Sequence, residues 1–563
     1  MKLPDLLEPT PRLRLDARLF AETLTFAFAT GSSPEAFERV LKSFDPGPTS
    51  FDAELFSRDL FVKDLVTRCL CPPGGKRDRY PLLQRPLLAV LTHPSTDLAT
   101  LRFRQQLLAS LTASGELQRA VLQGVAELRY LFELFHGGER ARHSAAVLRR
   151  LDILRALKNT IEKLGRTFAK AEGPLARVSD FIADVERSEG WAHLCSLLDY
   201  ESNLATIDVR VRLGHDGEIR SFAIQRVDEN RKNPWYSSPW RRFASRLSLL
   251  LRGLHVRRSE LLGRLVEGVF DDMQEVWLAL FQLMLDLELY VAALRFRELA
   301  RSKGLEVCLP ELSELSSSAQ GSRLERVFNP FLLLESSSPV PCDVEHSPHA
   351  ISIITGPNSG GKTRLLQAVG LTQLLAQAGL FVPARAAQLS LRSGMFVSLV
   401  QQAEADQAEG RLGTELTRIR RLFESLPFGG LAILDELCSG TNPTEGEEIF
   451  QLLIELLGEL SPVAFISTHF LGLAARLERE RPVELAFLEV ELGPSGRPTY
   501  RFVPGVAKTS LARGVAERLG VTRESLLALL EQRRAEQSDT GERESPPSPL
   551  LASAQSGKSE PLT

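Results

Sequence analysis

The chain has 563 residues, of which 43% are hydrophobic and 25% are charged, and its formal net charge is −3. These values are typical of a soluble globular protein, and the length allows three or four domains. A charge this close to neutrality excludes a chain that is basic throughout, so any nucleic-acid partner requires a local basic patch.

The start of the chain and its cysteines predict the compartment. Residues 1–5 do not begin the apolar core of a signal peptide, and no apolar run reaches about 20 residues, the length that spans a bilayer. The six cysteines are scattered, and only Cys69 and Cys71 stand close together, so no second pair completes a metal site. We therefore expect a cytoplasmic protein without membrane contact, whose cysteines are reduced and structural.

Residues 1–90 predict a small helical N-terminal region with no chemistry of its own. Apolar residues are frequent there, but turn sequences such as residues 31–34 and 72–75 interrupt them. The following segment, residues 91–310, predicts a mostly helical region, because apolar residues recur at helical spacing from Leu98 onward. Residues 270–299 are strongly apolar but carry acidic residues, among them Asp271, Asp272, Glu275, Asp286 and Glu288, which favours a buried helix over a membrane span.

A β-hairpin is predicted inside this helical region. Residues 207–213 and 219–224 alternate between apolar and polar side chains on either side of Asp216 and Gly217, and Asp-Gly is a strong hairpin signal.

Behind the hairpin lies a basic island, residues 226–264, with ten basic residues against three acidic ones and with interleaved aromatic residues. Such a segment suits phosphate contacts along DNA, although a solvated arginine-rich helix face has the same composition. The candidate DNA contacts within the island are Arg241, Arg242, Arg246, Arg257 and Arg258.

Residues 311–345 contain serine and proline and predict a connector. Beyond it, a β-branched run, a glycine-rich loop and an amphipathic helix follow one another, which is the context that a phosphate-binding P-loop requires. The loop fits the pattern G-x-x-x-x-G-K-[ST], and its residues are Gly356, Pro357, Asn358, Ser359, Gly360, Gly361, Lys362 and Thr363. Lys362 is expected to reach the β/γ-phosphates of ATP, and the Thr363 hydroxyl is expected to hold Mg²⁺.

Acidic and histidine side chains follow two further predicted strands. Residues 431–434 form a buried run that ends in Asp435 and Glu436, and residues 463–467 lead to His469. Since such strand ends meet beside the P-loop of an α/β sheet, Asp435 is a candidate Mg²⁺ ligand. Glu436 can polarise the attacking water, and His469 can sense the γ-phosphate, so both are candidate catalytic residues.

These motifs occur in an order that resembles the MutS family of DNA mismatch-repair ATPases. The resemblance covers about residues 345–530 and includes the P-loop, residues 381–384, Asp435 with Glu436, residues 439–443 and residues 467–470. The amino-acid sequence of residues 440–446 resembles the second bacterial MutS subfamily more closely than the mismatch-recognising one. Residues 535–563 are rich in glutamate, serine and proline, so we expect a disordered tail without that subfamily's C-terminal nuclease module.

The resemblance implies a fold and a domain order. An α/β P-loop ATPase domain of the ABC type, residues 346–534, is expected to follow a mostly α-helical lever and clamp domain with a small β-hairpin insertion. The lever would cover residues 91–310, with the clamp around residues 205–264. The first 90 residues are too few for the family's mismatch-binding and connector domains, so a Phe-x-Glu match at Phe20–Glu22 is taken as chance.

The resemblance also implies a function: ATP hydrolysis with Mg²⁺, coupled through a homodimer of ATPase domains to a clamp on double-stranded or branched DNA, in mismatch repair or control of recombination. One departure concerns turnover, because Gly413 and Thr414 stand where the family has a serine-containing signature that completes the neighbouring subunit's site. Two alternatives therefore stay open. One is a nucleotide-dependent clamp on a target other than DNA, such as the ribosome, and the other is an ATP-sensing structural dimer with little turnover.

Overall fold

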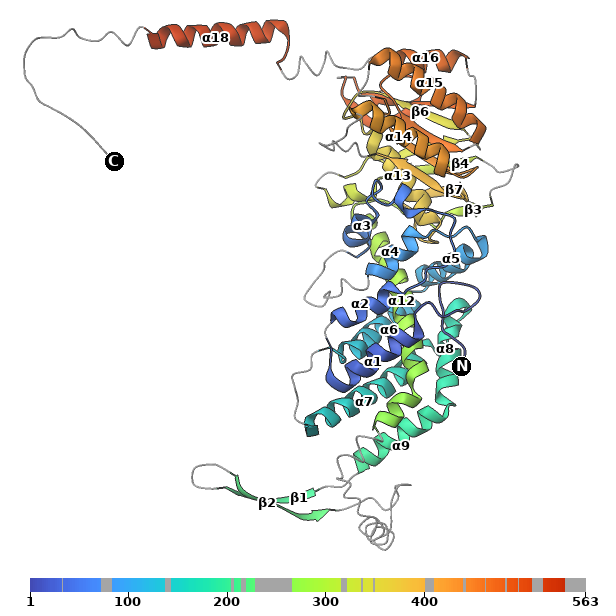
Figure 1. Ribbon diagram of the computed structural model, residues 1–563, viewed down its shortest axis with the longest axis vertical. Helices are drawn as coiled ribbons and strands as arrows, with labels where there is room; N and C mark the ends of the chain where they lie inside the picture. The colour runs from blue at the N-terminus through green and yellow to red at the C-terminus, as the bar shows by residue number, and fades with distance from the viewer. Residues whose placement is uncertain are drawn as a thin grey trace, which may run out of the picture.

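The computed structural model describes most of the chain. The described residues are 1–32, 34–71, 84–136, 143–203, 207–213, 219–227, 266–314, 321–335, 338–347, 350–399, 410–438, 442–460, 462–480, 484–494, 496–508 and 520–541. They form an elongated molecule with a mixed α/β domain at one end, helices in the middle and a β-hairpin at the other end (Figure 1).

The helical part is organised around one long helix, α12 (Gln274–Ser302), which runs through its centre (Figure 1). Its side chains are buried over most of its length, including Trp277 and Tyr290. Among the residues that the structure describes, α12 has the length and composition of a helix that could cross a membrane, but its apolar stretch is entirely buried inside the fold. The prediction of a buried helix here is confirmed. The other helices of this part are α1 (Ala17–Thr30), α2 (Glu38–Lys42), α3 (Val62–Asp64), η3 (Leu65–Leu70), α4 (Gln84–Thr92), α5 (Leu98–Ala113), α6 (Gly115–Glu133), α7 (His143–Phe168), α8 (Ala176–Glu186) and α9 (Glu189–Asn203).

The N-terminal region is part of the same core rather than a separate unit. Helix α12 packs against α1, α4, α6 and η3, and the Phe20 and Phe281 rings lie 5.2 Å apart. Phe20 is only 1% exposed, so the Phe-x-Glu match at this position belongs to a packed helix. Leu60 contacts the α/β domain, because a β-carbon placed on Gly370 of that domain would lie 2.8 Å from the Leu60 side chain. The first 71 residues therefore tie the helical part to the α/β domain.

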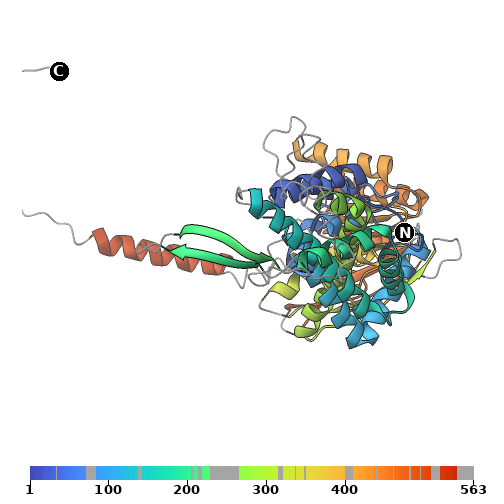
Figure 2. The ribbon, with the colours of Figure 1, turned by 90° about the horizontal axis from the view of Figure 1, so that it is seen from below.

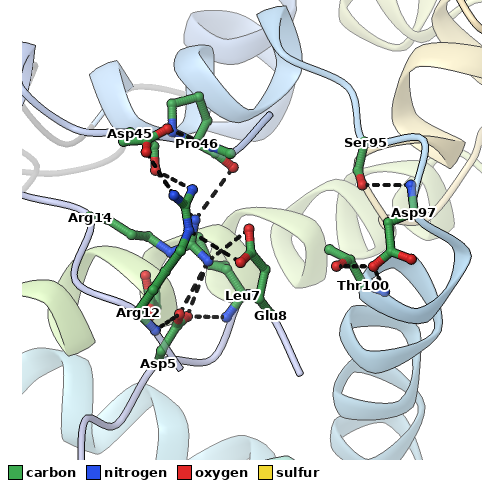
Figure 3. A network of polar contacts seen from close by, with 12 residues as sticks. Asp5, Leu7, Glu8, Arg12, Arg14, Asp45, Pro46, Ser95, Asp97 and Thr100 are labelled. Carbon is green, nitrogen blue, oxygen red and sulfur yellow. Dashed lines mark hydrogen bonds and ion pairs between the residues drawn. The ribbon is translucent and has the colours of Figure 1, made fainter. Parts of the chain in front are cut away.

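A buried ion network fastens the first residues of the chain. The Arg14 guanidinium and the Asp5 carboxylate are both 0% exposed and form an ion pair of 3.2 Å, and Glu8 adds a second pair of 3.3 Å. Arg14 also donates hydrogen bonds to the carbonyls of Asp45 and Pro46 (Figure 3). Burial, together with the nearby Asp5 charge, raises the pKa of Asp286 on α12, whose carboxylate accepts a hydrogen bond from the Leu6 amide.

Replacing Arg14 with methionine is expected to lower the free energy of unfolding by about 3–5 kcal/mol, because Asp5 would remain buried without its cation. Thermal unfolding followed by circular dichroism measures the loss. The matched control is Arg18→Met, since the Arg18 side chain is 90% exposed and pairs with Glu22 one turn away on the surface. Its effect on the free energy of unfolding should stay within about 0.5 kcal/mol. Equal stability of the two variants would contradict this account of the network.

The α/β domain contains two sheets among its described residues. The six-stranded sheet has the order β12-β11-β6-β10-β9-β8, and all neighbouring pairs are parallel except β11 and β12. The four-stranded sheet has the order β3-β7-β4-β5. The strands are β3 (Glu311–Ser313), β4 (Ser322–Val327), β5 (Cys342–His346), β6 (Ile351–Thr355), β7 (Ala386–Ser390), β8 (Met395–Ser398), β9 (Leu431–Asp435), β10 (Val463–Ser467), β11 (Leu485–Leu492) and β12 (Pro498–Pro504).

Strand alternation places helices on both faces of the six-stranded sheet. Ile433 and Phe465 face one side with the residues of α13 (Lys362–Ala376), whereas Leu434 and Ile466 face the other side. That second face is covered by α14 (Gly410–Ser425), α15 (Pro443–Leu460) and α16 (Leu471–Glu480). The result is a three-layer arrangement, and the α/β class predicted for this domain is confirmed.

Two predicted boundaries are wrong. Residues 311–345 are not a plain connector, because they contribute β3, β4 and β5 to the four-stranded sheet; their serines and prolines lie largely between these strands. Helix α18 (Arg523–Gly541) continues into the segment predicted to be disordered from residue 535. Residues 542–563 lie outside the described part of the chain.

The predicted hairpin is confirmed. Strands β1 (Ile207–Leu213) and β2 (Ile219–Val227) pair antiparallel and project away from the helices (Figure 2). The turn around Asp216 and Gly217 lies outside the described residues, as does the basic island beyond Val227.

Candidate nucleotide-binding site

A glycine-rich loop connects β6 with α13 and takes a conformation that side chains would obstruct. Gly356 has a φ of +135°, and a β-carbon there would lie 2.6 Å from the Val490 side chain on β11. Gly361 has a φ of +91° and directly precedes the first residue of α13. Such a turn leaves backbone N–H groups and the helix N-terminus available to an anion.

Lys362 is held inside this loop. Its side chain is 4% exposed, and its ammonium donates hydrogen bonds to the carbonyls of Gly356 at 3.1 Å and Pro357 at 3.3 Å. The ammonium also forms an ion pair of 3.1 Å with the Glu436 carboxylate. A nucleotide site of this kind requires a cation that faces the phosphates. Phosphate oxygens could replace the carbonyl and carboxylate oxygens that now accept hydrogen bonds from Lys362.

The Thr363 hydroxyl and the Asp435 carboxylate meet across the sheet edge. Thr363 Oγ1 donates a hydrogen bond of 2.5 Å to Asp435 Oδ2, and the Ser467 hydroxyl donates to the other carboxylate oxygen. Burial raises the pKa of Asp435, while these two hydrogen bonds act in the opposite direction. The convergence depends on topology, because β10 lies between β6 and β9 and its last residue is Ser467.

Glu436 follows β9 in a left-handed conformation with a φ of 49°. Its amide donates to both the carbonyl and the hydroxyl oxygen of Ser467, which holds the strained residue in place. Non-glycine residues with this backbone geometry are uncommon and concentrate at functional sites. The conformation directs the carboxylate toward Lys362, with which it pairs.

Lys362, Thr363, Asp435 and Glu436 line one cavity of about 720 Å³, a volume that suits a nucleotide. The sequence prediction of the site included the P-loop, Asp435 and Glu436, but it did not include the apolar residues that line the same cavity. These lining residues include Phe328, which follows β4, Val340, which precedes β5, and Tyr500 and Phe502, which lie within β12. Nothing in the sequence around Val340, Tyr500 or Phe502 indicated that these side chains line the same cavity as the P-loop.

The predicted catalytic His469 is not brought to this cavity. It is exposed, its ring lies 4.2 Å from that of Phe470, and it is absent from the cavity wall. Gly413 lies on α14, where its carbonyl accepts a hydrogen bond from the Thr417 hydroxyl. The candidate DNA contacts Arg241, Arg242, Arg246, Arg257 and Arg258 lie outside the described residues.

The donor set fits one magnesium ion rather than a dedicated metal cage. Within the described part of the chain, no group of three or more His, Cys, Asp or Glu side chains could hold a metal. Mg²⁺ in phosphate-transfer sites is bound by one or two carboxylates, with waters and substrate phosphates completing the octahedron. The Thr363 hydroxyl and the Asp435 carboxylate supply that minimal set. None of the six cysteines, all of which lie among the described residues, is joined in a disulfide.

Comparison with known proteins agrees with this geometry. Residues 352–529 match the family model of MutS domain V. Three similar proteins are each named Endonuclease MutS2. That of Thermomicrobium roseum is 36% identical over 192 residues, covering 34% of this chain and 24% of the relative. That of Thermus thermophilus is 33% identical over 214 residues, which cover 38% of this chain and 28% of the relative. That of Fusobacterium nucleatum is 31% identical over 199 residues, which cover 35% of this chain and 25% of the relative.

The matches to these relatives extend over about a quarter of each relative's length. The family model begins within β6 and ends within α18, so it includes the P-loop, strand β9 with Asp435, and strands β11 and β12. Residues 352–529 of this chain are therefore similar to MutS domain V, the ATPase domain of that family.

Proposed function

We propose that this protein hydrolyses ATP and couples the reaction to a dimeric clamp on DNA. The observation that carries the proposal is the convergence of Lys362, Thr363, Asp435 and Glu436 on one cavity. Catalysis of phosphoryl transfer needs little besides positioning and charge neutralisation, and these four side chains supply both. The ABC-type assignment follows the family resemblance and remains part of this proposal.

Each side chain has a distinct role in the proposed reaction. Lys362 would exchange its contacts with the loop carbonyls and Glu436 for phosphate oxygens of the substrate. Mg²⁺, held by Thr363 and Asp435, would neutralise charge on the phosphates. Glu436, released from Lys362, would orient a water molecule and accept its proton. Ser467 would hold both Asp435 and the Glu436 backbone, so it serves as a positioning residue.

The helical part is coupled to the nucleotide site through the far end of α13. The Gln377 amide donates to the Ser95 carbonyl at 3.0 Å, immediately before α5, and Arg104 on α5 donates to the Ala378 carbonyl at 3.0 Å. Arg104 is 2% exposed, so this contact is buried inside the fold. A movement of α13 on ATP binding would therefore be transmitted to the helices, as expected for a lever.

The DNA-binding part of the proposal depends on the clamp around residues 205–264. The hairpin of β1 and β2 projects at the end of the molecule farthest from the α/β domain (Figure 1), and the basic island follows it in the sequence. ATPase domains of two copies would pair head to tail, so that two such hairpins enclose one duplex. We expect this assembly in the cytoplasm, in mismatch repair or in control of recombination.

Titration of labelled DNA at one fixed salt concentration tests this function. We expect a four-way junction to bind more tightly than a homoduplex, because a clamp on phosphates reads shape rather than base pairs. Replacing Arg241, Arg242 and Arg246 with alanine should weaken binding to every DNA alike and reduce its salt dependence. The matched control replaces three exposed arginines of the helical part, Arg18, Arg166 and Arg187.

The outcomes separate the candidate functions. Unchanged DNA affinity in the triple variant of the basic island would show that these arginines form a solvated face or contact another partner. Wild-type protein that hydrolyses ATP but binds no DNA would favour a clamp on another target, such as the ribosome. Wild-type protein that binds ATP with negligible steady-state turnover would favour an ATP-sensing dimer, the alternative raised by Gly413.

A further inference from the structure

Arg364 is a cation of the nucleotide cavity with no role in the reaction described above. It follows Lys362 and Thr363 in the first turn of α13 and lines the same cavity. That turn contains no acidic residue, although the positive end of a helix favours acids and disfavours cations. The arrangement is electrostatically unfavourable unless an anion lies close to the guanidinium.

The contacts of Arg364 within the described residues are weak. Its guanidinium donates one hydrogen bond of 3.2 Å to the Gln367 side chain, and it lies 4.0 Å from the Glu335 carboxylate. The side chains of Arg364 and Glu335 are both 51% exposed. An ion pair of this length and exposure contributes little, and a guanidinium has five N–H donors, so most of its capacity is available to a ligand.

A buried amide pair sets the direction of the Arg364 side chain. The Asn329 amide donates to Gln367 Oε1 at 2.8 Å and to the Arg364 carbonyl at 3.0 Å. Asn329 and Gln367 are each 3% exposed. Gln367 Oε1 is therefore a fixed acceptor, and its hydrogen bond with the half-exposed guanidinium favours a side-chain direction along the cavity lining.

The three consecutive side chains face different parts of the cavity. Lys362 points into the loop toward Glu436, and Thr363 points toward Asp435. Arg364 instead faces Glu335, at the end of the segment that begins with the cavity-lining Phe328. Glu335 belongs to the part of the cavity lining that includes Phe328 and Val340, whereas Lys362 and Thr363 contact Glu436 and Asp435. If the terminal phosphate binds at Lys362 and Thr363 and the base packs on the apolar lining, the phosphate nearest the ribose lies on the Arg364 side.

We propose that Arg364 binds the phosphate nearest the ribose, exchanging its weak contact with Glu335 for this anion. The inference rests on the proposed function, since it assumes that the cavity takes a nucleotide. A guanidinium binds phosphate through charge-assisted hydrogen bonds, which are stronger than its present contacts. The contact would be shared by nucleoside diphosphates and triphosphates, because both carry this phosphate.

Isothermal titration of the full chain with Mg²⁺ and either ADP or the non-hydrolysable analogue AMP-PNP tests the proposal. Arg364→Ala is expected to raise both dissociation constants by the same factor, about tenfold, and to reduce their salt dependence. Arg364→Lys should recover part of the affinity. Glu335→Gln is expected to tighten binding of both ligands by about twofold, since it removes the competing anion.

The outcomes distinguish this inference from the function on which it rests. Wild-type binding that Arg364→Ala leaves unchanged within twofold overturns the role of Arg364 alone. A loss confined to AMP-PNP also overturns it, because the guanidinium would then act on the terminal phosphate. Absence of nucleotide binding by the wild type overturns the proposed function and this inference together. An unchanged melting temperature in Arg364→Ala, whose side chain is half exposed, confirms that the fold is intact.

Discussion

Glu436→Gln is expected to reduce steady-state ATP hydrolysis at least about 100-fold while nucleotide affinity is maintained or increased. The two effects have one structural origin. Glu436 is the proposed base for the attacking water, and its carboxylate also forms the 3.1 Å pair with Lys362. A neutral amide keeps the size of the side chain but can neither accept the proton nor compete as an anion for the lysine.

Single-turnover hydrolysis and equilibrium binding of AMP-PNP measure these effects separately. Glu445→Gln is a suitable control, because Glu445 lies in the first turn of α15 and is absent from the cavity wall. Normal turnover by Glu436→Gln would show that the water is activated elsewhere. Weaker binding by that variant would contradict the competition between Glu436 and the substrate for Lys362.

Lys362→Ala is expected to weaken ATP and ADP binding at least about 100-fold, because the main cation facing the phosphates is lost. The structure adds a reason for this large effect. The ammonium is buried and already oriented by the loop carbonyls. Phosphate binding would therefore cost little conformational entropy of the lysine side chain. Lys163→Ala is the control, since Lys163 is an exposed residue of α7 that pairs with Glu127. Retained micromolar affinity in Lys362→Ala would refute the assignment.

The sequence by itself determined those features of the protein that depend on residues close together in the chain. The glycines and Lys362 of the P-loop are specified by one motif. The short apolar runs that end in Asp435 and Ser467 have the composition of buried strands, and both form strands. The alternation around Asp216 and Gly217 likewise predicted both strands of the hairpin. In each case the local backbone preference and the final packing agree, so pattern and spacing were sufficient.

The prediction was less successful where a role depends on a distant partner. Residues 311–345 have a loop-like composition, yet they form strands because β7, about 60 residues later, supplies the hydrogen bonds. His469 stands at the end of a strand, as Asp435 does, but it turns outward, and no local signal distinguishes the two. The role of residues 1–71 was also missed, since the burial of Arg14 and Leu60 depends on contacts with α12 and α13.

Only the tertiary structure decided how the cavity is closed and how its charges pair. Tyr500 lies about 140 residues from the P-loop, and it lines the cavity because β12 pairs with β11, which in turn lies beside β6. The pairing of Glu436 with Lys362 and the position of Arg364 near Glu335 are likewise contacts across the fold. Motifs specify which groups are present, whereas the free energy of packing the sheets and helices together determines which of those groups meet.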